Sequence, residues 1–402
     1  MKSLYISYDG ATEPLAQSQI IPYLKKLSQN KKINFILLTF EKKGLLEGIR
    51  QTDRVRQDLF SNDVKWVSLN YHKRPYVLST ILDIFVGIMV SAYIIKKYKV
   101  DVVHARSYIP ALISLVLKRL FNIKFIFDMR GFWADERVEA GLWPSGGLLF
   151  KITKFFERQF LLSADAIVSL TNAAKKELQT FRYMQQKPTS ITVIPTCVDT
   201  NIFEIRAESK DPWITRPELR GKFVFVYTGS VSTWYMLEEM LDFFRCSLTF
   251  IPNAHLLFIT HESQVVQASI LKKKINPDFF TIISVEHALI PRYLSTAKAG
   301  LAFYKPGYSR KACCPTKLGE YLACGIPVII NSGIGDSDKI IEEEGIGVVI
   351  KEFTGEEYLK GIKRLLWLLR QKDLKPRCRK VTEKYFSLEQ GVEKYWKLYQ
   401  QI

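Results

Sequence analysis

The sequence predicts an α/β protein made of two doubly wound parallel-sheet domains, on three observations. The chain has 402 residues, 47% hydrophobic and 24% charged, which suits two ordinary globular domains. Apolar runs alternate with segments of helical period along the whole length. The runs are continuously apolar, as in strands covered on both faces. A polar stretch, Glu204–Lys222, separates two complete strand–helix sets.

Apolar runs in both halves are predicted to be strands. In the first half they are Leu4–Tyr8, Ile33–Thr39, Val64–Leu69, Asp101–His104, Lys124–Phe127, Ala166–Leu170 and Ile191–Ile194. In the second half they are Phe223–Thr228, His255–Thr260, Phe280–Val285, Ala299–Phe303, Pro327–Ile330 and Gly347–Ile350. Beyond them, Glu356–Leu369 and the aromatic tail Tyr385–Tyr399 predict helices.

These elements predict a first domain over residues 1–203, a linker over 204–222 and a second domain over 223–384. We expect the last helix, about residues 385–402, to pack on the first domain. Parallel sheets bind ligands outside the carboxyl ends of their strands, so we expect both domains to offer those loops to one cleft.

The net charge of +18 favours anionic partners, namely nucleic acid, acidic lipid or phosphorylated substrates. No zinc finger or RNA-binding signature is present, so we do not expect a nucleic-acid partner. The first residues resemble a strand rather than a signal peptide. The six cysteines lack metal-ligand spacing, which indicates reduced thiols in a cytoplasm.

The segment Val77–Ile95 approaches the length of a membrane span and contains one charge, Asp83, before Lys96, Lys97 and Lys99. The runs on either side of it are predicted strands of one sheet, and a bilayer crossing would prevent the chain from returning. We therefore expect a helix that is buried or docked on a surface.

The most informative segment runs from Cys313 to Ile330. Proline and threonine at 315–316 start a helix, and Gly325 ends it. Lys317 and Glu320 share one face of that helix. Free N–H groups beside a lysine can bind phosphate, and a carboxylate one turn on can accept ribose hydroxyls. A capped surface helix with a Lys–Glu pair stays open as the alternative on these residues alone.

The run Pro315–Ile330 resembles the donor-binding motif of retaining glycosyltransferases of the GT-B fold, in the family 4 class. Three further segments resemble motifs of that class in the same order. Asp9–Gln19 resembles its loop after the first strand, Asp128–Glu136 its central cleft loop, and Thr228–Ser230 the turn that opens its second domain. The resemblance implies two Rossmann-like domains facing a cleft, the first on the acceptor side and the second binding a nucleotide-sugar donor.

The resemblance also implies site residues. On the donor, it places Glu320 at the ribose, and Glu286 and His287 facing the base. At the diphosphate it places Pro315, Thr316, Lys317, Gly229, Ser230, Ala16 and Gln17. Lys305 is a candidate for positive charge that the sequence lacks there. Those placed in the catalytic position are Arg130, where relatives often carry a histidine contacting the transferred sugar, with Asp128 and Arg106.

The sequence departs from this pattern in three places. Ala312 stands eight positions before Glu320, where relatives often have a first glutamate for the sugar. Ala16 replaces a common glycine. Val231–Trp234 replaces the usual arginine and lysine after the turn, a charge for which Lys305, Arg310 and Lys311 are candidates.

No metal or cofactor is expected, and the nucleotide-diphosphate sugar would be a co-substrate. Asp336 and Asp338 have the Asp-x-Asp form that binds metal in a different glycosyltransferase fold, but here they follow a strand and a glycine-rich turn, where Asp commonly caps a helix. The histidines lack ligand spacing, and His104 at a strand end is expected to be a packing or supporting residue.

The predicted function is retaining transfer of a sugar to a lipid-linked or saccharide acceptor, a precursor of surface polysaccharide or glycan. A nucleotide-sugar epimerase on the same fold and a non-catalytic sugar-nucleotide-binding subunit are the alternatives. We expect a cytoplasmic enzyme, peripheral on the inner face of the cell membrane. It would dock through residues 77–95 and through the segment Leu148–Leu162 with Lys151, Lys154 and Arg158, unless these faces pack on the sheet.

Overall fold

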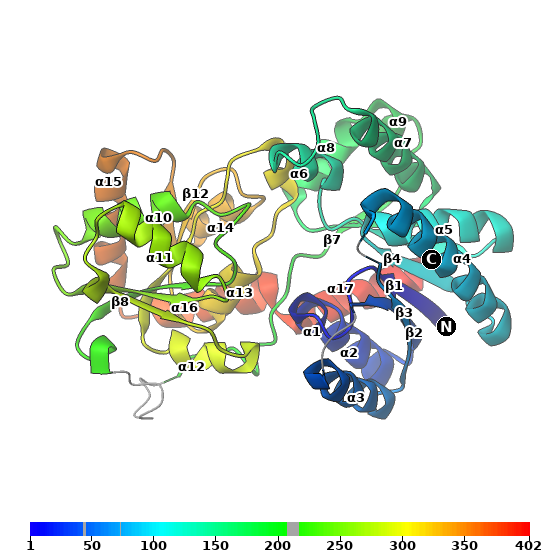
Figure 1. Cartoon of the computed structure of the whole chain (residues 1–402), viewed down its shortest axis with the longest axis horizontal. Helices are drawn as coiled ribbons and strands as arrows, with labels where there is room; N and C mark the ends of the chain where they lie inside the picture. The colour runs from blue at the N-terminus through cyan, green and yellow to red at the C-terminus, as the bar shows by residue number, and fades with distance from the viewer. Residues whose placement is uncertain (43–45, 73, 207–216) are drawn as a thin grey trace. The chain divides into compact units, whose positions relative to one another are not determined.

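The computed structural model describes residues 1–42, 46–72, 74–206 and 217–402, which form two compact units (Figure 1). Unit 1 comprises Met1–Pro195 and Leu388–Ile402, and unit 2 comprises Thr196–Ser387. Each unit contains one wholly parallel sheet with helices on its faces. The predicted fold class, two doubly wound Rossmann-like domains, is therefore confirmed.

Unit 1 has a seven-stranded sheet in the order β3-β2-β1-β4-β5-β6-β7. Its strands are β1 (Lys2–Ser7), β2 (Asn34–Glu41), β3 (Val64–Asn70), β4 (Val102–Arg106), β5 (Lys124–Asp128), β6 (Ala166–Ser169) and β7 (Ile191–Val193). Each apolar run predicted in the first half is one of these strands. The central strands are buried almost throughout, which explains why their sequences do not alternate.

The order reverses between β1 and β4, so the crossovers before and after the reversal place helices on opposite faces of the sheet. The helices of unit 1 are α1 (Pro14–Gln19), α2 (Ile21–Lys31), α3 (Leu46–Ser61), α4 (Tyr76–Tyr98), α5 (Tyr108–Phe121), α6 (Trp133–Glu139), α7 (Leu148–Ser163), α8 (Asn172–Thr180), α9 (Arg182–Gln186) and α17 (Leu388–Gln401). Of these, α5 packs between α4 and α7, while α17 packs against α2 (Figure 1).

The C-terminal helix α17 belongs to unit 1. It is held by ion pairs from α2, with Lys26 Nζ 2.6 Å from Glu389 Oε1 and Lys31 Nζ 2.9 Å from Glu393 Oε2. Its tyrosine Tyr399 is fully enclosed, and the Tyr399 hydroxyl lies 3.1 Å from Ser3 Oγ at the start of β1. The last residues of the chain therefore help to build the first domain.

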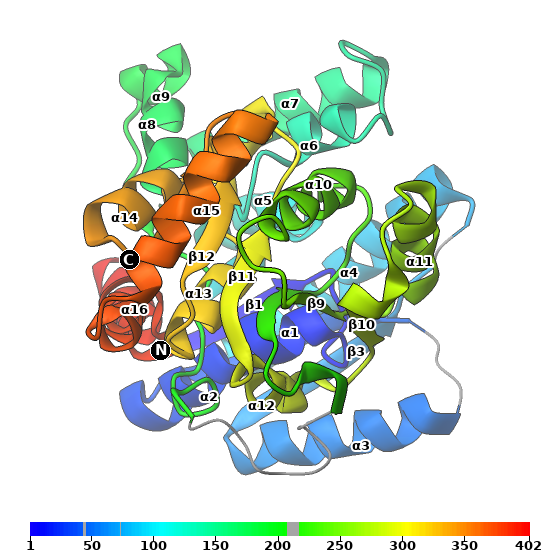
Figure 2. The ribbon, with the colours of Figure 1, turned by 90° about the vertical axis from the view of Figure 1, so that its left-hand side faces the viewer.

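Unit 2 has a six-stranded sheet in the order β10-β9-β8-β11-β12-β13 (Figure 2). Its strands are β8 (Phe223–Thr228), β9 (Ala254–Ile259), β10 (Phe280–Ile283), β11 (Ala297–Ala302), β12 (Val328–Asn331) and β13 (Gly347–Ile350). Its α-helices are α10 (Leu237–Ser247), α11 (Ser263–Lys272), α12 (Ile290–Leu294), α13 (Thr316–Ala323), α14 (Ser337–Glu344), α15 (Gly355–Leu369) and α16 (Leu374–Val381). Short η turns are η1 (Pro217–Leu219), η2 (Pro277–Phe279), η3 (His287–Leu289), η4 (Tyr308–Ala312) and η5 (Thr382–Phe386). Again every predicted run is a strand, and the order reverses between β8 and β11.

The two units divide at Pro195 and Thr196, before the stretch 204–222 that we predicted as the linker. Residues just after the division already bond within unit 2. Thr196 Oγ1 donates to the Cys314 carbonyl at 2.9 Å, and the Val198 N–H donates to the Phe386 carbonyl at 2.8 Å. Of the predicted linker, residues 207–216 lie outside the described residues.

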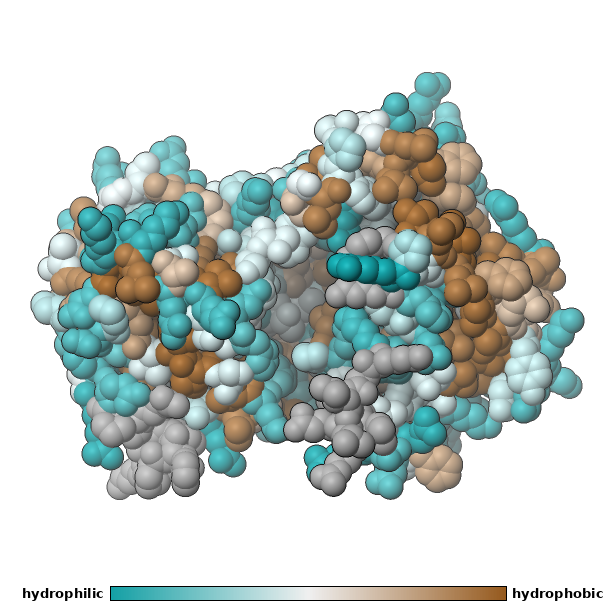
Figure 3. Space-filling model, in the orientation of Figure 1, coloured by the Kyte–Doolittle hydropathy of each residue, from teal (hydrophilic) through white to brown (hydrophobic). Residues whose placement is uncertain are grey.

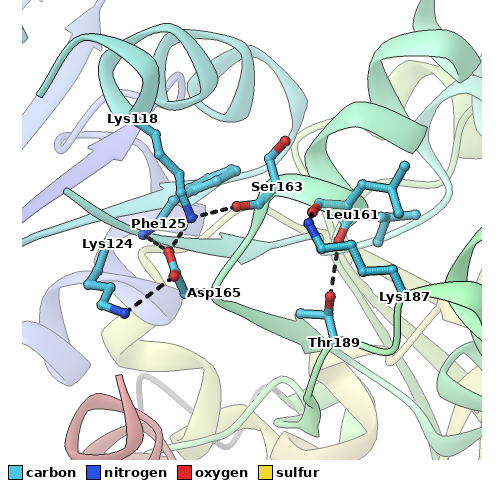
Figure 4. A network of polar contacts seen from close by, with 9 residues as sticks. Lys118, Lys124, Phe125, Leu161, Ser163, Asp165, Lys187 and Thr189 are labelled. Atoms are coloured by element: carbon cyan, nitrogen blue, oxygen red, sulfur yellow. Dashed lines mark hydrogen bonds and ion pairs between the residues drawn. The ribbon is translucent and has the colours of Figure 1, made fainter. Parts of the chain in front are cut away.

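A polar network ties the carboxyl end of α7 to the sheet of unit 1 (Figure 4). Asp165 accepts hydrogen bonds from Lys118 Nζ at 2.5 Å and from the Phe125 N–H at 2.8 Å, and Lys124 Nζ lies 3.5 Å away. Lys118 also donates to the Ser163 carbonyl at 2.7 Å. Burial raises the pKa of Asp165, but these donors outweigh it and lower that pKa below its usual value.

Asp165→Asn should lower the free energy of unfolding of unit 1 by about 1–2 kcal/mol, because it removes a charge that accepts two charge-assisted hydrogen bonds. Urea unfolding measures this. Asp58→Asn is the control, because Asp58 pairs with Lys25 at a more exposed position and its loss should cost under about 0.5 kcal/mol. Equal effects of the two substitutions would contradict the role given to this network.

Candidate functional site

In unit 2 the candidate donor site forms where the strand order reverses. Tyr321 of α13 is fully buried, and its hydroxyl accepts a hydrogen bond from the Thr228 N–H at 2.8 Å. This bond fastens the helix to the carboxyl end of β8. A side chain at Gly300 of β11 would overlap the Tyr321 ring, so a glycine there lets the helix approach the sheet. The first turn of α13 is thereby held at the switch point.

Lys317 lies in that first turn as a buried, unpaired cation. It is 6% exposed, and its Nζ has no hydrogen-bond partner among the described residues. The Nζ lies 3.8 Å from the ring centroid of Tyr227, 4.1 Å from that of Tyr235 and 5.7 Å from that of Tyr304. Burial lowers the pKa of Lys317 to about 7. The aromatic rings stabilise an ammonium only partly, so the site favours an added anion.

Glu320, one turn further along α13, is paired with His287. The His287 Nε2 lies 3.0 Å from Glu320 Oε1, and the Glu320 side chain is only 9% exposed. The hydrogen bond to Glu320 raises the pKa of His287. Phe203 lies beside the imidazole, with ring centroids 5.4 Å apart. The structure therefore brings together the residues predicted for ribose and base, while Glu286, before η3, is exposed.

An acidic residue that sequence analysis missed, Glu262 from the loop after β9, lies against the turn after β8. Glu262 accepts hydrogen bonds from Ser230 Oγ at 2.6 Å, from the Val231 N–H at 2.5 Å and from the Ser232 N–H at 3.1 Å. Burial raises the pKa of Glu262, but these donors lower it overall. The Ser230 hydroxyl, predicted to bind the donor, is thus occupied by a carboxylate of the chain itself. Gly229 has a φ of 98° and faces Lys317 Nζ.

The remaining predicted donor residues frame the start of α13. Pro315 is buried at its N-cap and Thr316 is half-buried. Ala312, which stands where the resemblance implies a first glutamate, is buried at the end of η4. Lys305 is exposed, and its N–H donates to the Trp234 carbonyl at 2.8 Å.

Arg310 is the better placed of the candidates for missing charge. It is 5% exposed, its guanidinium lies 4.7 Å from the ring centroid of Trp234, and its Nη2 donates to Ser309 Oγ at 2.9 Å. A cation held this way is fixed in position by its neighbours rather than by a carboxylate.

In unit 1 the three predicted catalytic residues lie together at the carboxyl edge of β4 and β5. Asp128 is fully buried, with Arg130 Nη1 3.7 Å from its Oδ1 and Arg106 Nη1 3.9 Å from its Oδ2. His104 Nε2 lies 3.7 Å from the same Oδ2. Burial raises the pKa of Asp128, but Arg130, His104 and Arg106 lower it to about 2. Asp128 is therefore a permanent anion between cations.

Burial divides the roles within this cluster. Asp128 is 0% exposed and Arg106 is 4% exposed, whereas the Arg130 side chain retains 13% exposure and has a positive φ of 62°. Asp128 also accepts a hydrogen bond from the Tyr395 hydroxyl of α17 at 2.8 Å. We therefore interpret Asp128 and Arg106 as positioning residues for Arg130, rather than as groups that themselves reach a ligand.

His104 is enclosed within unit 1. Its Nδ1 lies 2.7 Å from the Tyr399 hydroxyl, and burial lowers the pKa of its imidazole. Nearby Asp9, which follows β1, has its pKa raised by burial and lowered in part by the charge of Arg106.

The loop after β1 is fastened internally. Glu41 at the end of β2 accepts hydrogen bonds from the Ala11 N–H at 2.6 Å and from Thr12 Oγ1 at 3.1 Å. The Gln17 side-chain amide donates to the Ala11 carbonyl at 2.6 Å, and Ala16 is fully buried. Gln17 thus holds the loop, and Ala16 is enclosed within unit 1.

The described residues contain no group of three or more His, Cys, Asp or Glu that could hold a metal ion. Asp336 is at the N-cap position of α14, and Asp338 Oδ2 accepts a hydrogen bond from the Gly333 N–H at 2.8 Å. Both aspartates belong to a turn and helix start, as the sequence context indicated.

Two family sequence models match the chain. Residues 50–202 match Glycosyltransferase Family 4, and residues 285–391 match the C-terminal domain of Glucosyltransferase 3-like proteins. No curated protein matches the sequence.

The fold is similar to several solved structures. Sucrose-phosphate synthase from Thermosynechococcus elongatus has a TM-score of 0.73 at 14% identity, with 100% of this chain and 98% of that chain covered. A glycosyltransferase from Rickettsia africae has a TM-score of 0.70 at 19% identity, covering 100% and 98%. Anabaena HepE, in complex with UDP and glucose, has a TM-score of 0.71 at 10% identity, covering 100% of both chains.

Lys317→Met should stabilise the unliganded protein by on the order of 2 kcal/mol at pH 7, because an apolar side chain of similar length replaces an uncompensated buried charge. The lysine pKa is about 7 in the folded protein against 10.5 ordinarily, so the cost of the charge develops as pH falls from 10.5 towards 7 and is constant below. The stabilisation should therefore shrink as pH is raised to 10.

Thermal and urea unfolding at pH 6, 7, 8.5 and 10 measure the effect. Lys339→Met is the control, because Lys339 is exposed on α14 and its replacement should change stability by less than about 0.5 kcal/mol at any of these values. A Lys317→Met protein less stable than the parent at pH 7 would show that the ammonium is compensated.

Proposed function

We propose that this chain, whose fold is GT-B, is a glycosyltransferase that transfers a sugar from a nucleoside-diphosphate sugar to an acceptor with retention of anomeric configuration. The observation that carries the proposal is Lys317, a buried cation whose Nζ has no hydrogen-bond partner among the described residues, at the strand-order reversal of unit 2. A diphosphate supplies the negative charge that this position lacks.

Each part of a nucleoside diphosphate has a matching group. The N–H groups at the start of α13 and Lys317 suit the diphosphate. The Glu320 carboxylate suits two ribose hydroxyls, and its hydrogen bond to His287 fixes its orientation. Structures of HepE contain UDP and UDP-glucose, so UDP-sugars are the first donors to test.

The proposed chemistry relies on stabilising the leaving group. The bond between the anomeric carbon and the diphosphate oxygen breaks, and negative charge grows on that oxygen as the acceptor oxygen bonds to the same face of the sugar. The acceptor's proton passes to the departing phosphate. Lys317 and the helix N-terminus stabilise the growing charge, which is electrostatic catalysis. We propose that Arg130, held by Asp128, contacts the sugar or acceptor, and that no metal is needed.

We propose a lipid-linked or surface-polysaccharide precursor as the acceptor, and a cytoplasmic location at the inner face of the membrane. The six cysteines form no disulfide among the described residues, which agrees with a reducing compartment. The net charge of +18 agrees with phosphorylated or membrane-bound partners.

A non-catalytic sugar-nucleotide-binding subunit is the second candidate. Two observations favour it, namely Ala312 where the resemblance implies a glutamate, and the Glu262 carboxylate on the N–H groups of the turn after β8. A screen of nucleotide sugars by thermal shift, followed by mass spectrometry of products on lipid-linked acceptors with and without EDTA, separates the two. A product formed in EDTA supports metal-free transfer. Donor binding without any product supports the binding subunit.

Glu320→Ala should weaken UDP binding at least tenfold, because two charge-assisted hydrogen bonds of roughly 1.5–3 kcal/mol each would be lost. Isothermal titration calorimetry measures it, with circular dichroism as a check of folding. Glu343→Ala, on the exposed face of α14, is the matched control and should bind UDP as the parent does. Unchanged affinity in Glu320→Ala would remove Glu320 from the site.

UDP binding at pH 8 should take up close to one proton, because Lys317 is mostly neutral there and the diphosphate restores its charge. The uptake should fall towards zero at pH 6, where Lys317 is already charged. Calorimetry in buffers of different ionisation enthalpy gives the number. Lys317→Met should abolish the uptake. The same uptake in that variant would assign the proton to another group such as His287.

A further inference from the structure

Helix α4 of unit 1 exposes a row of large apolar side chains. Their individual exposed fractions lie between 48% and 67%. They are Val77, Leu78, Ile81, Leu82, Phe85, Met89 and Tyr93. Figure 3 shows hydrophobic residues gathered along this side of unit 1. Their spacing of three or four residues places them on one face of the helix. Apolar patches of this kind on a soluble domain mark an interaction surface.

The opposite face of α4 packs on unit 1. A side chain at Gly87 would lie 2.7 Å from Ile113 Cδ1 of α5 and 3.1 Å from Phe40 of β2, so the helix approaches both closely. Ile94 and Ile95 are buried against the same core. Helix α4 is therefore apolar on two faces, one that packs on the core and one whose large side chains remain largely exposed.

Asp83 fixes the helix to the sheet. Its side chain is 1% exposed and accepts hydrogen bonds from the Tyr8 hydroxyl at 2.8 Å and the His72 N–H at 3.2 Å, with His72 Nδ1 2.6 Å away. Tyr8 follows β1, so the N-terminal half of α4 lies beside the edge that carries Asp9 and Arg106.

By length and composition alone, Val77–Tyr98 could span a bilayer, and only 33% of its most apolar stretch is buried. The strands before and after it, β3 and β4, belong to the same parallel sheet. A crossing would break that sheet and move the Asp83 carboxylate into hydrocarbon. A helix that lies along a membrane surface has its apolar face covered and leaves the sheet intact.

Basic residues flank the apolar face at both ends. Arg74 precedes α4 and is exposed, and Lys96, Lys97 and Lys99 are exposed at its C-terminal end. Lys97 Nζ lies 5.2 Å from the ring centroid of Tyr93, a Lys–aromatic pair typical of membrane interfaces. A second copy of this face would bring like charges together, whereas an anionic leaflet complements them.

The basic residues predicted on α7 are less available. Lys154 lies 2.5 Å from Glu157 and 3.1 Å from Asp135, and the Arg158 guanidinium lies 5.3 Å from the ring centroid of Tyr183. Lys151 is exposed. Two of the three basic residues predicted to dock α7 therefore already have contacts within unit 1, Lys154 with a buried glutamate and Arg158 with a tyrosine ring.

We propose that the exposed face of α4 docks in the headgroup region of an anionic lipid bilayer, with the helix parallel to the membrane plane. This interaction goes beyond the proposed sugar transfer, since it needs neither donor nor acceptor. It would place the carboxyl edge of unit 1 at the membrane surface, where a lipid-linked substrate would present its polar head.

Co-sedimentation of the full chain with vesicles tests this proposal. Vesicles of phosphatidylcholine alone are compared with vesicles containing 30% phosphatidylglycerol, about one anionic lipid in three, at low and high salt. We expect binding only to the anionic vesicles, weakened by salt. Leu78→Ser with Phe85→Ser, and Lys96→Glu with Lys97→Glu and Lys99→Glu, should each reduce the bound fraction at least tenfold.

Two controls keep the outcome interpretable. Leu271→Ser alters an exposed apolar residue of α11 in unit 2, 69% exposed, and should bind vesicles as the parent does. UDP affinity of the α4 variants, measured by calorimetry, should be unchanged, so a failure of docking is distinct from a failure of donor binding.

Undiminished vesicle binding by the Leu78→Ser, Phe85→Ser variant would overturn the proposal, as would equal recovery of the parent protein with neutral and anionic vesicles. A parent dimer in analytical ultracentrifugation that Leu78→Ser with Phe85→Ser converts to monomer would also overturn it, because a second copy would then cover this face.

Discussion

The reversal of strand order in each parallel sheet is the constraint on which the rest of the molecule depends. Right-handed crossovers send helices to one face before the reversal and to the other face after it. At the carboxyl ends of the two strands that meet there, the loops diverge, and polar side chains gather. In unit 1 this edge presents Asp9 and Arg106, and in unit 2 it presents Gly229 and the first turn of α13.

Buried positive charge has different surroundings at the carboxyl edges of the two sheets. In unit 1, Asp128 lies within 3.9 Å of two guanidinium groups, so each arginine has an anion beside it before any ligand arrives. In unit 2, Lys317 lies against tyrosine rings, its Nζ has no hydrogen-bond partner among the described residues, and burial lowers its pKa to about 7. A compensated cluster orients one arginine, whereas an uncompensated cation creates affinity for a ligand that carries the missing charge.

Sequence reasoning predicted the strands because parallel strands buried on both faces are continuously apolar, and it predicted the start of α13 because proline and glycine delimit that helix. It could not predict Glu262 on the amides of Val231 and Ser232, since an acid after a strand has no local signature. Nor could it predict the Tyr395 hydroxyl on Asp128, because the two residues are 267 positions apart. The partners of Lys154 were missed for the same reason. Periodicity shows which face of a helix is polar but not what each charge meets.

Helix α4 shows how one buried residue decides between two interpretations of the same composition. Hydropathy alone does not distinguish a membrane span from a helix with one face on a core and another on a membrane surface. Asp83 favours the second interpretation, because its carboxylate is held by Tyr8 and His72 on the sheet side. Removing the carboxylate from those donors would leave a buried charge without partners. Any partner that covers the exposed face of α4 must therefore bind it while the helix stays on the sheet. The same hydrogen bonds connect that face to the loop after β1, so whatever covers α4 lies close to the edge of the sheet where unit 1 carries its arginines.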